Sequence, residues 1–399
     1  MKTQDFVAME KKYLAPNYNP LDVVIESGEG VWVSDVEGKK YMDFLAAYSA
    51  LNQGYCHPRI KKAMLDQVEK VTLTSRAFRN DKLPLLAEKL CTLLGYEMML
   101  PMNSGAEAVE TALKAARKWG YKHKNVPEGK AHMIAMSNNF HGRTITIVSF
   151  STEEDYRAGF GPFTDGFTVI PYGDVAALEK AITPHTVAVL MEPIQGEAGI
   201  IIPPEGTLKK VREVCDRHRM LMIADEIRSG LGRTGRMLAC EWENVKPDMV
   251  CLGKALSGGF YPVSAVVGSA EVMTVFNPGE HGSTFGGNPM AAAVAIAALD
   301  VLVEEKLVER AAELGAVAMD KLAPLAKNPL VKEIRGRGLW IGIELKPEAG
   351  GARKYCMKLM EKGVLAKDTH HHTIRLAPPL VITREELLAG LDKVLEVLA

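Results

Sequence analysis

Six short apolar runs in the middle of the chain constrain its fold more than any other feature. They are rich in Val, Ile, Leu and Met and are apolar at successive positions: Met133–Met136, Thr168–Ile170, Val187–Met191, Leu221–Ala224, Met249–Leu252 and Val263–Val267. Such runs are typical of strands covered on both faces, as in a mainly parallel sheet. Helical patterns at Asp174–Ala181 and Thr207–Arg219 lie between them. This alternation predicts an α/β layered domain.

The pattern changes after Asn288. An Ala-rich helical stretch, Met290–Leu302, is followed by further helical and strand-like segments: Val308–Ala326, Leu339–Leu345, Arg353–Lys362, Ile374–Leu376 and Arg384–Leu398. Near the N-terminus, Val31–Val33 and Tyr41–Phe44 flank a Glu37-Gly38 turn. We therefore expect three parts: an N-terminal segment, 1–48, packing with the small domain; a large domain, 49–287; and a small C-terminal α/β domain, 288–399.

The composition excludes several classes of protein. With 48 Lys and Arg against 49 Asp and Glu, the net charge is −1, so nothing indicates binding to nucleic acid or to an anionic membrane. No run approaches the ~18 apolar residues of a membrane span. The six cysteines are scattered without a C-x-x-C pair, which favours free thiols and a cytoplasmic location. His370–His372 has no ligand spacing, so no metal site is expected.

Polar residues follow four of the apolar runs directly or within a few positions. They are Asn139 to Arg143, then Glu192 with Gln195 and Glu197, then Asp225 with Glu226, and finally Gly253 with Lys254. Ligands of open α/β sheets bind beyond the carboxyl ends of the strands. Any one of these residues could be a solvated loop residue, but their convergence predicts a single polar site.

Lys254 and Asp225 suit a pyridine-ring cofactor. Partial desolvation lowers the pKa of a lysine and favours the neutral amine that forms an imine. A carboxylate at the end of an apolar strand needs a cation or donors, and a protonated ring nitrogen would provide one. These residues therefore predict pyridoxal phosphate held as a Schiff base on Lys254, with Asp225 at the ring nitrogen. The alternative is a structural Lys–Asp ion pair.

Two glycine-containing segments bear on the cofactor phosphate. Ser104 and Glu107 fit an S-x-x-E capping box. The same helix start, with Gly105 and Ala106, exposes N–H groups that suit an anion. The two interpretations compete, and the spacing alone favours capping. Gly230–Gly235 matches G-x-G-x-x-G, but five residues separate it from the preceding strand. A dinucleotide site needs a tight strand-to-helix turn, so this alternative is disfavoured.

Five segments in order along the chain resemble class III, fold type I pyridoxal-phosphate aminotransferases: NSGAEAVETALKAAR, NNFHGRT, EPIQGEAG, the stretch from ADEIRSGLGRTGR to LGKALSGG, and HGSTFGGNP. Others resemble the ornithine δ-aminotransferases of that family: NYNPLDV, DFLAAYSALNQGYCHP, TLTSRAF and IRLAPPLVI. The resemblance spans nearly the whole chain. It implies a large domain with a mainly parallel seven-stranded sheet, a smaller C-terminal domain and a homodimer.

The resemblance also implies roles around the cofactor. Lys254 would move a proton between substrate and cofactor, and Asp225 would pair with the ring N–H. Phe140 and Ile227 would cover the two ring faces. Ser104, Gly105 and Ala106 would bind the phosphate, joined by Thr284 from the neighbouring subunit. Arg228 stands where the family has a Gln bonded to the ring oxygen; a cation there can donate to that oxygen or turn away.

For the substrates, an amino acid and a 2-oxo acid, the resemblance implies two binding modes. Tyr18 and Arg143 would hold the α end of ornithine, and Tyr48 would shape the pocket. Arg375 would bind the α-carboxylate of glutamate or 2-oxoglutarate, with Glu197 masking its charge when ornithine is bound. Asn19 and Asp22 depart from the ornithine-specific pattern. Acetylornithine, 4-aminobutyrate or lysine as donor, an aminomutase, and a non-catalytic relative therefore stay as alternatives.

Overall fold

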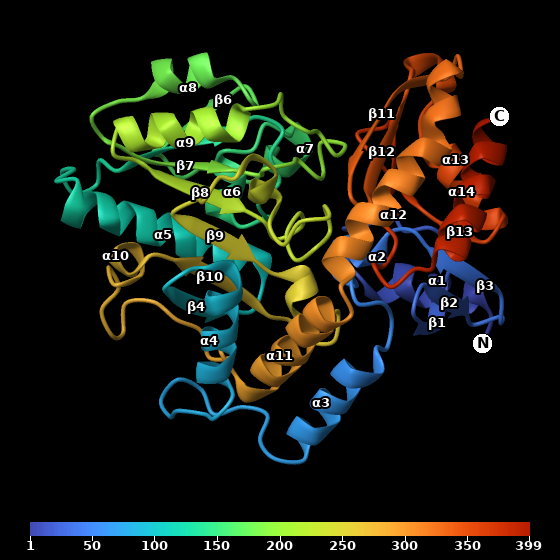
Figure 1. Cartoon of the computed structure of the whole chain (residues 1–399), viewed down its shortest axis with the longest axis horizontal. Helices are drawn as coiled ribbons and strands as arrows, with labels where there is room; N and C mark the ends of the chain where they lie inside the picture. The colour runs from blue at the N-terminus through green and yellow to red at the C-terminus, as the bar shows by residue number, and fades with distance from the viewer.

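A seven-stranded sheet organises the larger part of the chain (Figure 1). The computed structural model describes all 399 residues. In spatial order the strands are β4 (Met98–Met102), β10 (Ser264–Gly268), β9 (Met249–Leu252), β8 (Leu221–Asp225), β7 (Thr186–Met191), β5 (His132–Met136) and β6 (Phe167–Ile170). Only β10 runs antiparallel to its neighbours. The six predicted runs are all present, and the central β7, β8 and β9 are buried along their whole lengths.

Helices cover both faces of this sheet. Figure 1 shows α8 (Val175–Ala181) and α9 (Thr207–Arg217) on one side and α5 (Gly105–His123) on the other. The remaining helices of this part are α3 (Pro58–Val68), α4 (Leu83–Leu94), α6 (Ile145–Ser149), α7 (Glu154–Arg157) and α10 (Ala270–Met273). Helix α11 (Pro289–Glu304) packs against α3 and α4 and leads into the C-terminal part. The apolar side of α5 packs against β9 and β10 because small residues such as Ala108, Ala112 and Ala116 let the helix approach closely.

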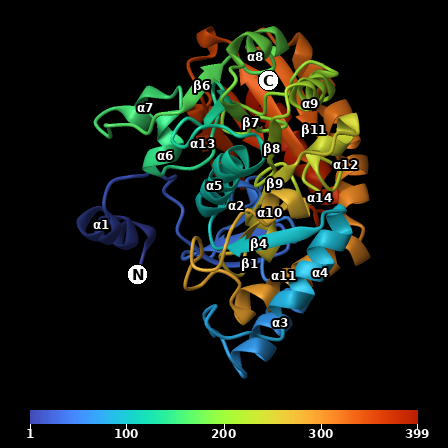
Figure 2. The same ribbon diagram turned by 90° about the vertical axis from the view of Figure 1, so that its left-hand side faces the viewer.

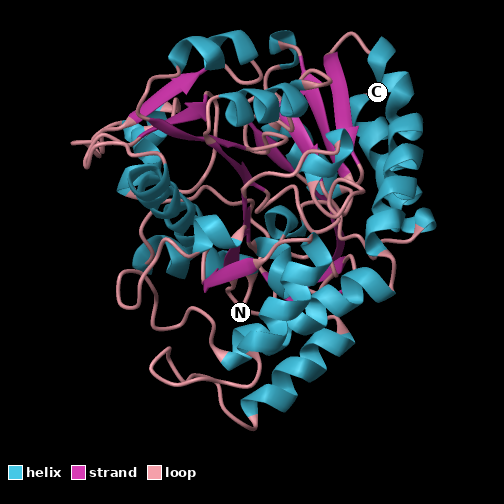
Figure 3. Cartoon of the chain, turned by 60° about the vertical axis from the view of Figure 1, so that its left-hand side comes forward, coloured by secondary structure: helices cyan, strands magenta, loops and turns pink.

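The C-terminal part is a second layered unit with its own antiparallel sheet. Its strands, in spatial order, are β11 (Val331–Arg337), β12 (Trp340–Leu345), β15 (Thr373–Leu376) and β14 (Lys367–Thr369). Helices α12 (Leu307–Leu322), α13 (Arg353–Glu361) and α14 (Arg384–Leu398) pack together beside it, as Figure 3 shows. Short 3-10 turns, η3 (Ala323–Lys327) and η4 (Pro347–Ala349), connect these elements.

The N-terminal residues form a third, small sheet. Strands β1 (Ile25–Glu29), β2 (Trp32–Asp35) and β3 (Lys40–Asp43) pair in sequence, and β3 pairs in parallel with β13 (Val364–Leu365) of the C-terminal part. By contrast, α1 (Thr3–Tyr13) buries no residue and projects from the body of the molecule in Figure 2. No helix of the structure is both long and apolar enough to cross a membrane.

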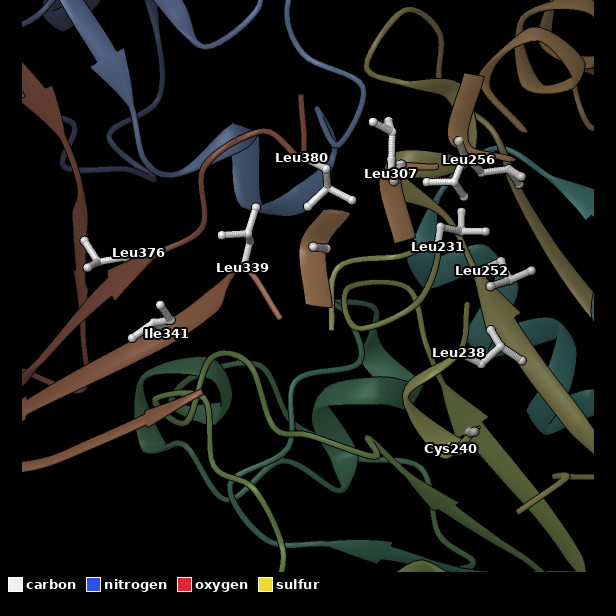
Figure 4. Packing of buried hydrophobic residues seen from close by; sticks show 14 of the residues in the cluster. Leu231, Leu238, Cys240, Leu252, Leu256, Leu307, Leu339, Ile341, Leu376 and Leu380 are labelled. Atoms are coloured by element: carbon white, nitrogen blue, oxygen red, sulfur yellow. The ribbon is translucent and has the colours of Figure 1, made fainter. Parts of the chain in front are cut away.

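One hydrophobic cluster continues from the large sheet into the C-terminal part. It includes Leu231, Leu252 and Leu256 on one side and Leu339 and Leu380 on the other (Figure 4). A shared core of this kind fixes the relative position of the two units.

The glycines of the G-x-G-x-x-G segment lie at the junction between the two units, where they allow the two backbones to pack closely. Gly232 and Gly235 have φ of +89° and +80°. A Cβ atom on Gly235 would lie 2.8 Å from the Cα of Ala312, and one on Gly338 would lie 2.4 Å from the carbonyl carbon of Thr234. The segment therefore packs tightly against the C-terminal part and does not begin a dinucleotide-binding helix.

Candidate active site

A cavity of about 200 Å³ opens where β7, β8 and β9 end. Eight residues predicted from the sequence line it: Gly105, Ala106, Phe140, Glu197, Asp225, Ile227, Arg228 and Lys254. Because the carboxyl ends of parallel strands meet at one edge, segments far apart in the sequence converge there. Ile194, Gly142, Ser229, His141 and Glu192 complete the lining.

Lys254 begins the 3-10 turn η2 (Lys254–Ser257), with only Gly253 between it and the end of β9. Its φ is +44°, a left-handed conformation that a side-chain-bearing residue adopts at a cost of about 1–3 kcal/mol. The pKa of its amine is lowered from 10.5 to about 8, mainly by burial and also by the nearby charge of Arg228, against the opposing effect of Asp225 and Glu197. At physiological pH this amine therefore has a larger neutral fraction than an ordinary lysine.

Asp225 ends β8 and is held from two directions. Its Oδ2 atom lies 2.7 Å from Nδ1 of His141, and its Oδ1 atom accepts the N–H of Ile227 at 3.0 Å. Asp225 is 5% exposed and His141 3%. A buried carboxylate fixed in this way presents a defined negative charge to the cavity.

Glu192 is a second buried carboxyl beside Asp225. Burial raises its pKa to about 7; the charge of His141 lowers that pKa and the charge of Asp225 raises it. The Glu192 side chain accepts N–H bonds from Phe140 at 3.0 Å and from Gly196 at 3.1 Å. It therefore ties together the two loops that carry Phe140 and Glu197.

The sequence predicts that His141 and Glu192 lie in the polar site but assigns neither of them a role. Their positions after apolar runs indicate that they lie at the site. Their hydrogen-bond partners could not be predicted, because these contacts join segments far apart in the sequence.

The start of α5 is a capping box. The Oγ atom of Ser104 accepts the N–H of Glu107 at 3.2 Å, and the Glu107 carboxylate accepts the N–H of Ser104 at 2.8 Å. The N–H of Ser104 is therefore not free to bind an anion, because it already donates to Glu107. The Ser104 side chain is exposed. Gly105 and Ala106 are the first two helical residues, where N–H groups are left unpaired, and both line the cavity. Ser104 thus caps the helix, as the first interpretation has it. The N–H groups of Gly105 and Ala106 are still free to bind an anion, as the second interpretation requires.

Phe140 and Ile227 supply apolar surface to the cavity. Phe140 packs edge-on against Tyr156, with the ring centroids 5.9 Å apart. Ile227 packs close to Gly105, where an added Cβ would lie 3.1 Å from its Cδ1 atom. A flat ring between such surfaces would be covered on its faces while its edge meets Asp225 and Lys254.

Glu197 bridges two arginines. Its Oε2 atom accepts from Nη1 of Arg375 at 2.8 Å, and its Oε1 atom pairs with Nη1 of Arg228. Burial raises the pKa of Glu197, but the charges of Arg228 and Arg375 outweigh it and lower that pKa to about 2. Arg228 has turned toward Glu197, while its Nε and Nη2 atoms have no hydrogen-bond partner.

Tyr48 reaches this site from a left-handed turn. All four residues of α2 (Ala46–Ser49) have positive φ, between 46° and 69°. Such a conformation costs roughly 1–2 kcal/mol per residue that has a Cβ. The turn places the Tyr48 ring 5.2 Å from the Arg375 guanidinium and 5.5 Å from that of Arg228. Backbone strain here positions an aromatic ring over both arginines.

Besides Ser104, three predicted site residues are exposed outside the cavity lining. Tyr18 is 72% exposed and lies with the segment that follows α1. Arg143 stacks on Tyr156, with its guanidinium carbon 4.1 Å from the ring centroid, at the rim beside Phe140. Thr284 is exposed on the loop before α11. Within one chain these residues are not gathered with Lys254.

The cavity fits pyridoxal phosphate on its own geometry. Gly105 and Ala106 offer unpaired N–H groups to a phosphate, Asp225 offers a fixed carboxylate to a ring nitrogen, and Lys254 offers an amine of lowered pKa to an aldehyde. No group of three or more His, Cys, Asp or Glu side chains is arranged to hold a metal ion. The fold and the site together define a pyridoxal-phosphate-dependent aminotransferase.

Comparison with known proteins identifies the family. Residues 13–398 match the family model of the class III aminotransferases, so the chain belongs to that family. An ornithine aminotransferase of Brevibacillus brevis is 58% identical over 397 residues, covering 100% of this chain and 98% of the relative.

Solved structures agree with this assignment. A Toxoplasma gondii ornithine aminotransferase superposes with a TM-score of 0.98 at 47% identity, covering 100% of this chain and 95% of the other. An acetylornithine aminotransferase of Elizabethkingia anophelis reaches a TM-score of 0.91 at 48% identity, with 100% and 99% covered. The fold is thus shared by enzymes named for two different amino donors.

Proposed function

We propose that this chain transfers the δ-amino group of L-ornithine to 2-oxoglutarate, giving glutamate-5-semialdehyde and glutamate in a ping-pong sequence. The observation that carries the proposal is the ion pair between Glu197 and Arg375 beside the cofactor cavity. A free, buried arginine binds an α-carboxylate in bidentate fashion. Ornithine captured in that way would present its α-amine to the cofactor, so Arg375 must be masked for δ-amine transfer.

The two substrates would then use opposite ends of the site. Ornithine would bind with its α-carboxylate near Arg143 and Tyr18 and its δ-amine toward Lys254, while Glu197 stays on Arg375. Glutamate or 2-oxoglutarate would place its α-carboxylate on Arg375 after Glu197 moves. Tyr48, stacked near Arg375, would limit the width of the pocket at that point. One cavity could thereby accept two substrates of different charge.

Several residues would act on the cofactor and the reacting carbon. Pyridoxal phosphate, when bound, supplies an electron sink for the carbon that loses its proton. Lys254 would hold the aldehyde carbon and then carry the proton between substrate and cofactor. Asp225, fixed by His141, would keep the ring nitrogen protonated. Phe140 and Ile227 would cover the ring faces, and the first-turn N–H groups of α5 would hold the phosphate.

A homodimer is the assembly we propose. Thr284 is exposed and outside the cavity lining of its own chain, which is the arrangement expected if it serves the site of a second subunit. Exposed Phe78 and Phe285, at 74% and 49%, would be covered in the same contact.

The domain division and the location of the protein are also proposals. We propose parts 1–48, 49–287 and 288–399 as its units. The small sheet that joins β3 to β13 supports pairing of the first part with the third. Six free cysteines, five of them buried, support a reducing cytoplasmic location.

A single-turnover amine panel tests this function. The holoenzyme would be mixed in turn with ornithine, acetylornithine, lysine and 4-aminobutyrate, following the cofactor absorbance. Ornithine should react at least tenfold faster than each other amine, an advantage of about 1.4 kcal/mol in the transition state. Faster reaction of acetylornithine would favour the second candidate, to which the Elizabethkingia structure points. Turnover without any 2-oxo acid would indicate an aminomutase.

A further inference from the structure

Glu197 is a carboxylate shared between two buried guanidinium groups. Arg228 is 7% exposed and Arg375 is 2% exposed. Each holds a different oxygen of the same carboxylate through its Nη1 atom. Two positive charges and one negative charge give these three residues a net charge of +1. Glu197 alone is enough to neutralise Arg375, so Arg228 is an additional cation beside this pair.

The Arg228 side chain is enclosed by Tyr48, Trp340 and Gly196. Its guanidinium carbon lies 5.5 Å from the ring centroids of both Tyr48 and Trp340. A Cβ atom on Gly196 would lie 2.7 Å from the Cδ of Arg228, so only glycine leaves room for this side chain. The Nε and Nη2 atoms of Arg228 are buried without a hydrogen-bond partner. Arg228 is therefore fixed beside Glu197 and still has donors to offer.

We infer that Arg228 determines specificity by retaining the Glu197 carboxylate when a substrate carboxylate takes Arg375. A buried carboxylate that loses its only cation is strongly disfavoured. Here Glu197 keeps a cation in both states, because an unpartnered N–H of Arg228 can donate to the oxygen that Arg375 releases. The cost of freeing Arg375 falls, and dicarboxylate ligands gain affinity as a result. This inference rests on the proposed assignment of Arg375 to the α-carboxylate of a dicarboxylic substrate.

The consequence differs between the two substrates. A dicarboxylate must displace Glu197 from Arg375, whereas ornithine binds with that pair intact. Arg228 should therefore favour the dicarboxylate half of the reaction and contribute little to the ornithine half. A residue that merely supported the fold would affect both halves alike.

The test is equilibrium binding of glutarate, a dicarboxylate with no amine or ketone to react, to the holoenzyme by titration calorimetry. Arg228→Gln should weaken glutarate binding about tenfold, because Glu197 then has no cation to move to. In a Glu197→Gln background the same change should alter affinity less than about twofold. An unchanged affinity in the single variant would overturn the inference. An equal tenfold loss in both backgrounds would also overturn it, since Arg228 would then bind glutarate itself.

Three further variants keep the result interpretable. Arg228→Lys retains a charge with one nitrogen and should lose less affinity than Arg228→Gln; an equal loss would contradict charge retention. Arg236→Gln, at an exposed arginine stacked on Trp242, is the matched control and should leave glutarate binding unchanged. Arg375→Ala separates the two proposals. If it keeps glutarate affinity, the assignment of Arg375 fails; if only Arg375→Ala loses affinity, the assignment stands and the role of Arg228 fails.

Discussion

His141 and Asp225 form a buried pair, with the Nδ1 atom of the imidazole 2.7 Å from the Oδ2 atom of the carboxylate. The two residues are 84 positions apart: His141 lies in the loop after β5, and Asp225 is the last residue of β8. The N–H of Ile227 holds the other oxygen of Asp225. The acid that would meet the cofactor ring is thus fixed in orientation before any ligand binds.

Asp225→Asn is therefore expected to lower turnover by at least about 100-fold, because an amide does not stabilise a protonated ring nitrogen. His141→Phe, which removes only the partner of the acid, should lower turnover by about tenfold. Steady-state kinetics at saturating cofactor measures both, with circular dichroism as the check on folding. Asp225→Asn with turnover within twofold of the parent would contradict the role of the acid.

The lowered pKa of Lys254 predicts how the apoenzyme combines with pyridoxal phosphate. Its pKa falls from 10.5 to about 8, and the neutral amine is the reactive form. The rate of combination should rise with pH through about 8 and then level off, as stopped-flow absorbance can follow. A rate still rising steeply at pH 10, or flat throughout, would contradict the lowered pKa.

Glu192, whose pKa is raised to about 7, titrates near the same range. The variant Glu192→Gln is the control for the pH profile, because the inflection near pH 8 should survive in it. Its disappearance would assign the inflection to Glu192 and not to Lys254.

The two half-reactions should separate at Arg375. Arg375→Ala should slow the reaction of the amino form of the enzyme with 2-oxoglutarate by about 100-fold or more, because a bidentate charged contact is lost. The reaction of the aldehyde form with ornithine should change by less than about fivefold, because ornithine does not use that contact. Single-turnover kinetics of each half measures the difference. Equal losses in both halves would defeat the two-orientation proposal.

The junction between the two units predicts a stability effect. An alanine at Gly338 would place its Cβ 2.4 Å from the carbonyl carbon of Thr234, whereas one at Gly129 would meet no atom within 4 Å. Both glycines have positive φ, at +55° and +75°, so the backbone strain is matched. Gly338→Ala should cost about 2 kcal/mol more than Gly129→Ala in thermal or urea unfolding. Equal midpoints for the two variants would show that the junction can relax.

Much of this architecture could be predicted from local sequence. The runs that became β5, β7, β8 and β9 are uniformly apolar because they are covered on both faces, and α14 has the limits that its periodicity predicts. Lys254 and Asp225 could be placed in one site because parallel strands bring their carboxyl ends to one edge. The antiparallel direction of β10 was not predictable, since its run is as apolar as its parallel neighbours.

The contacts that define the site could not be read from the sequence. The pairing of His141 with Asp225 and the bridging of Arg228 and Arg375 by Glu197 join segments brought together only by the fold. The sequence left Arg228 free to meet the cofactor or to turn away, and its direction depends on the slot between Gly196, Tyr48 and Trp340. Long-range packing of this kind leaves no local pattern.

The most direct test of the central claim is reduction of the cofactor-loaded enzyme with borohydride, followed by peptide mapping by mass spectrometry. Lys254 is the lysine that lines the cavity, at the end of β9 and opposite Asp225. The cofactor should therefore be found bonded to Lys254, and Lys254→Ala should give no adduct and no turnover. An adduct on another lysine, or full turnover in Lys254→Ala, would contradict the account.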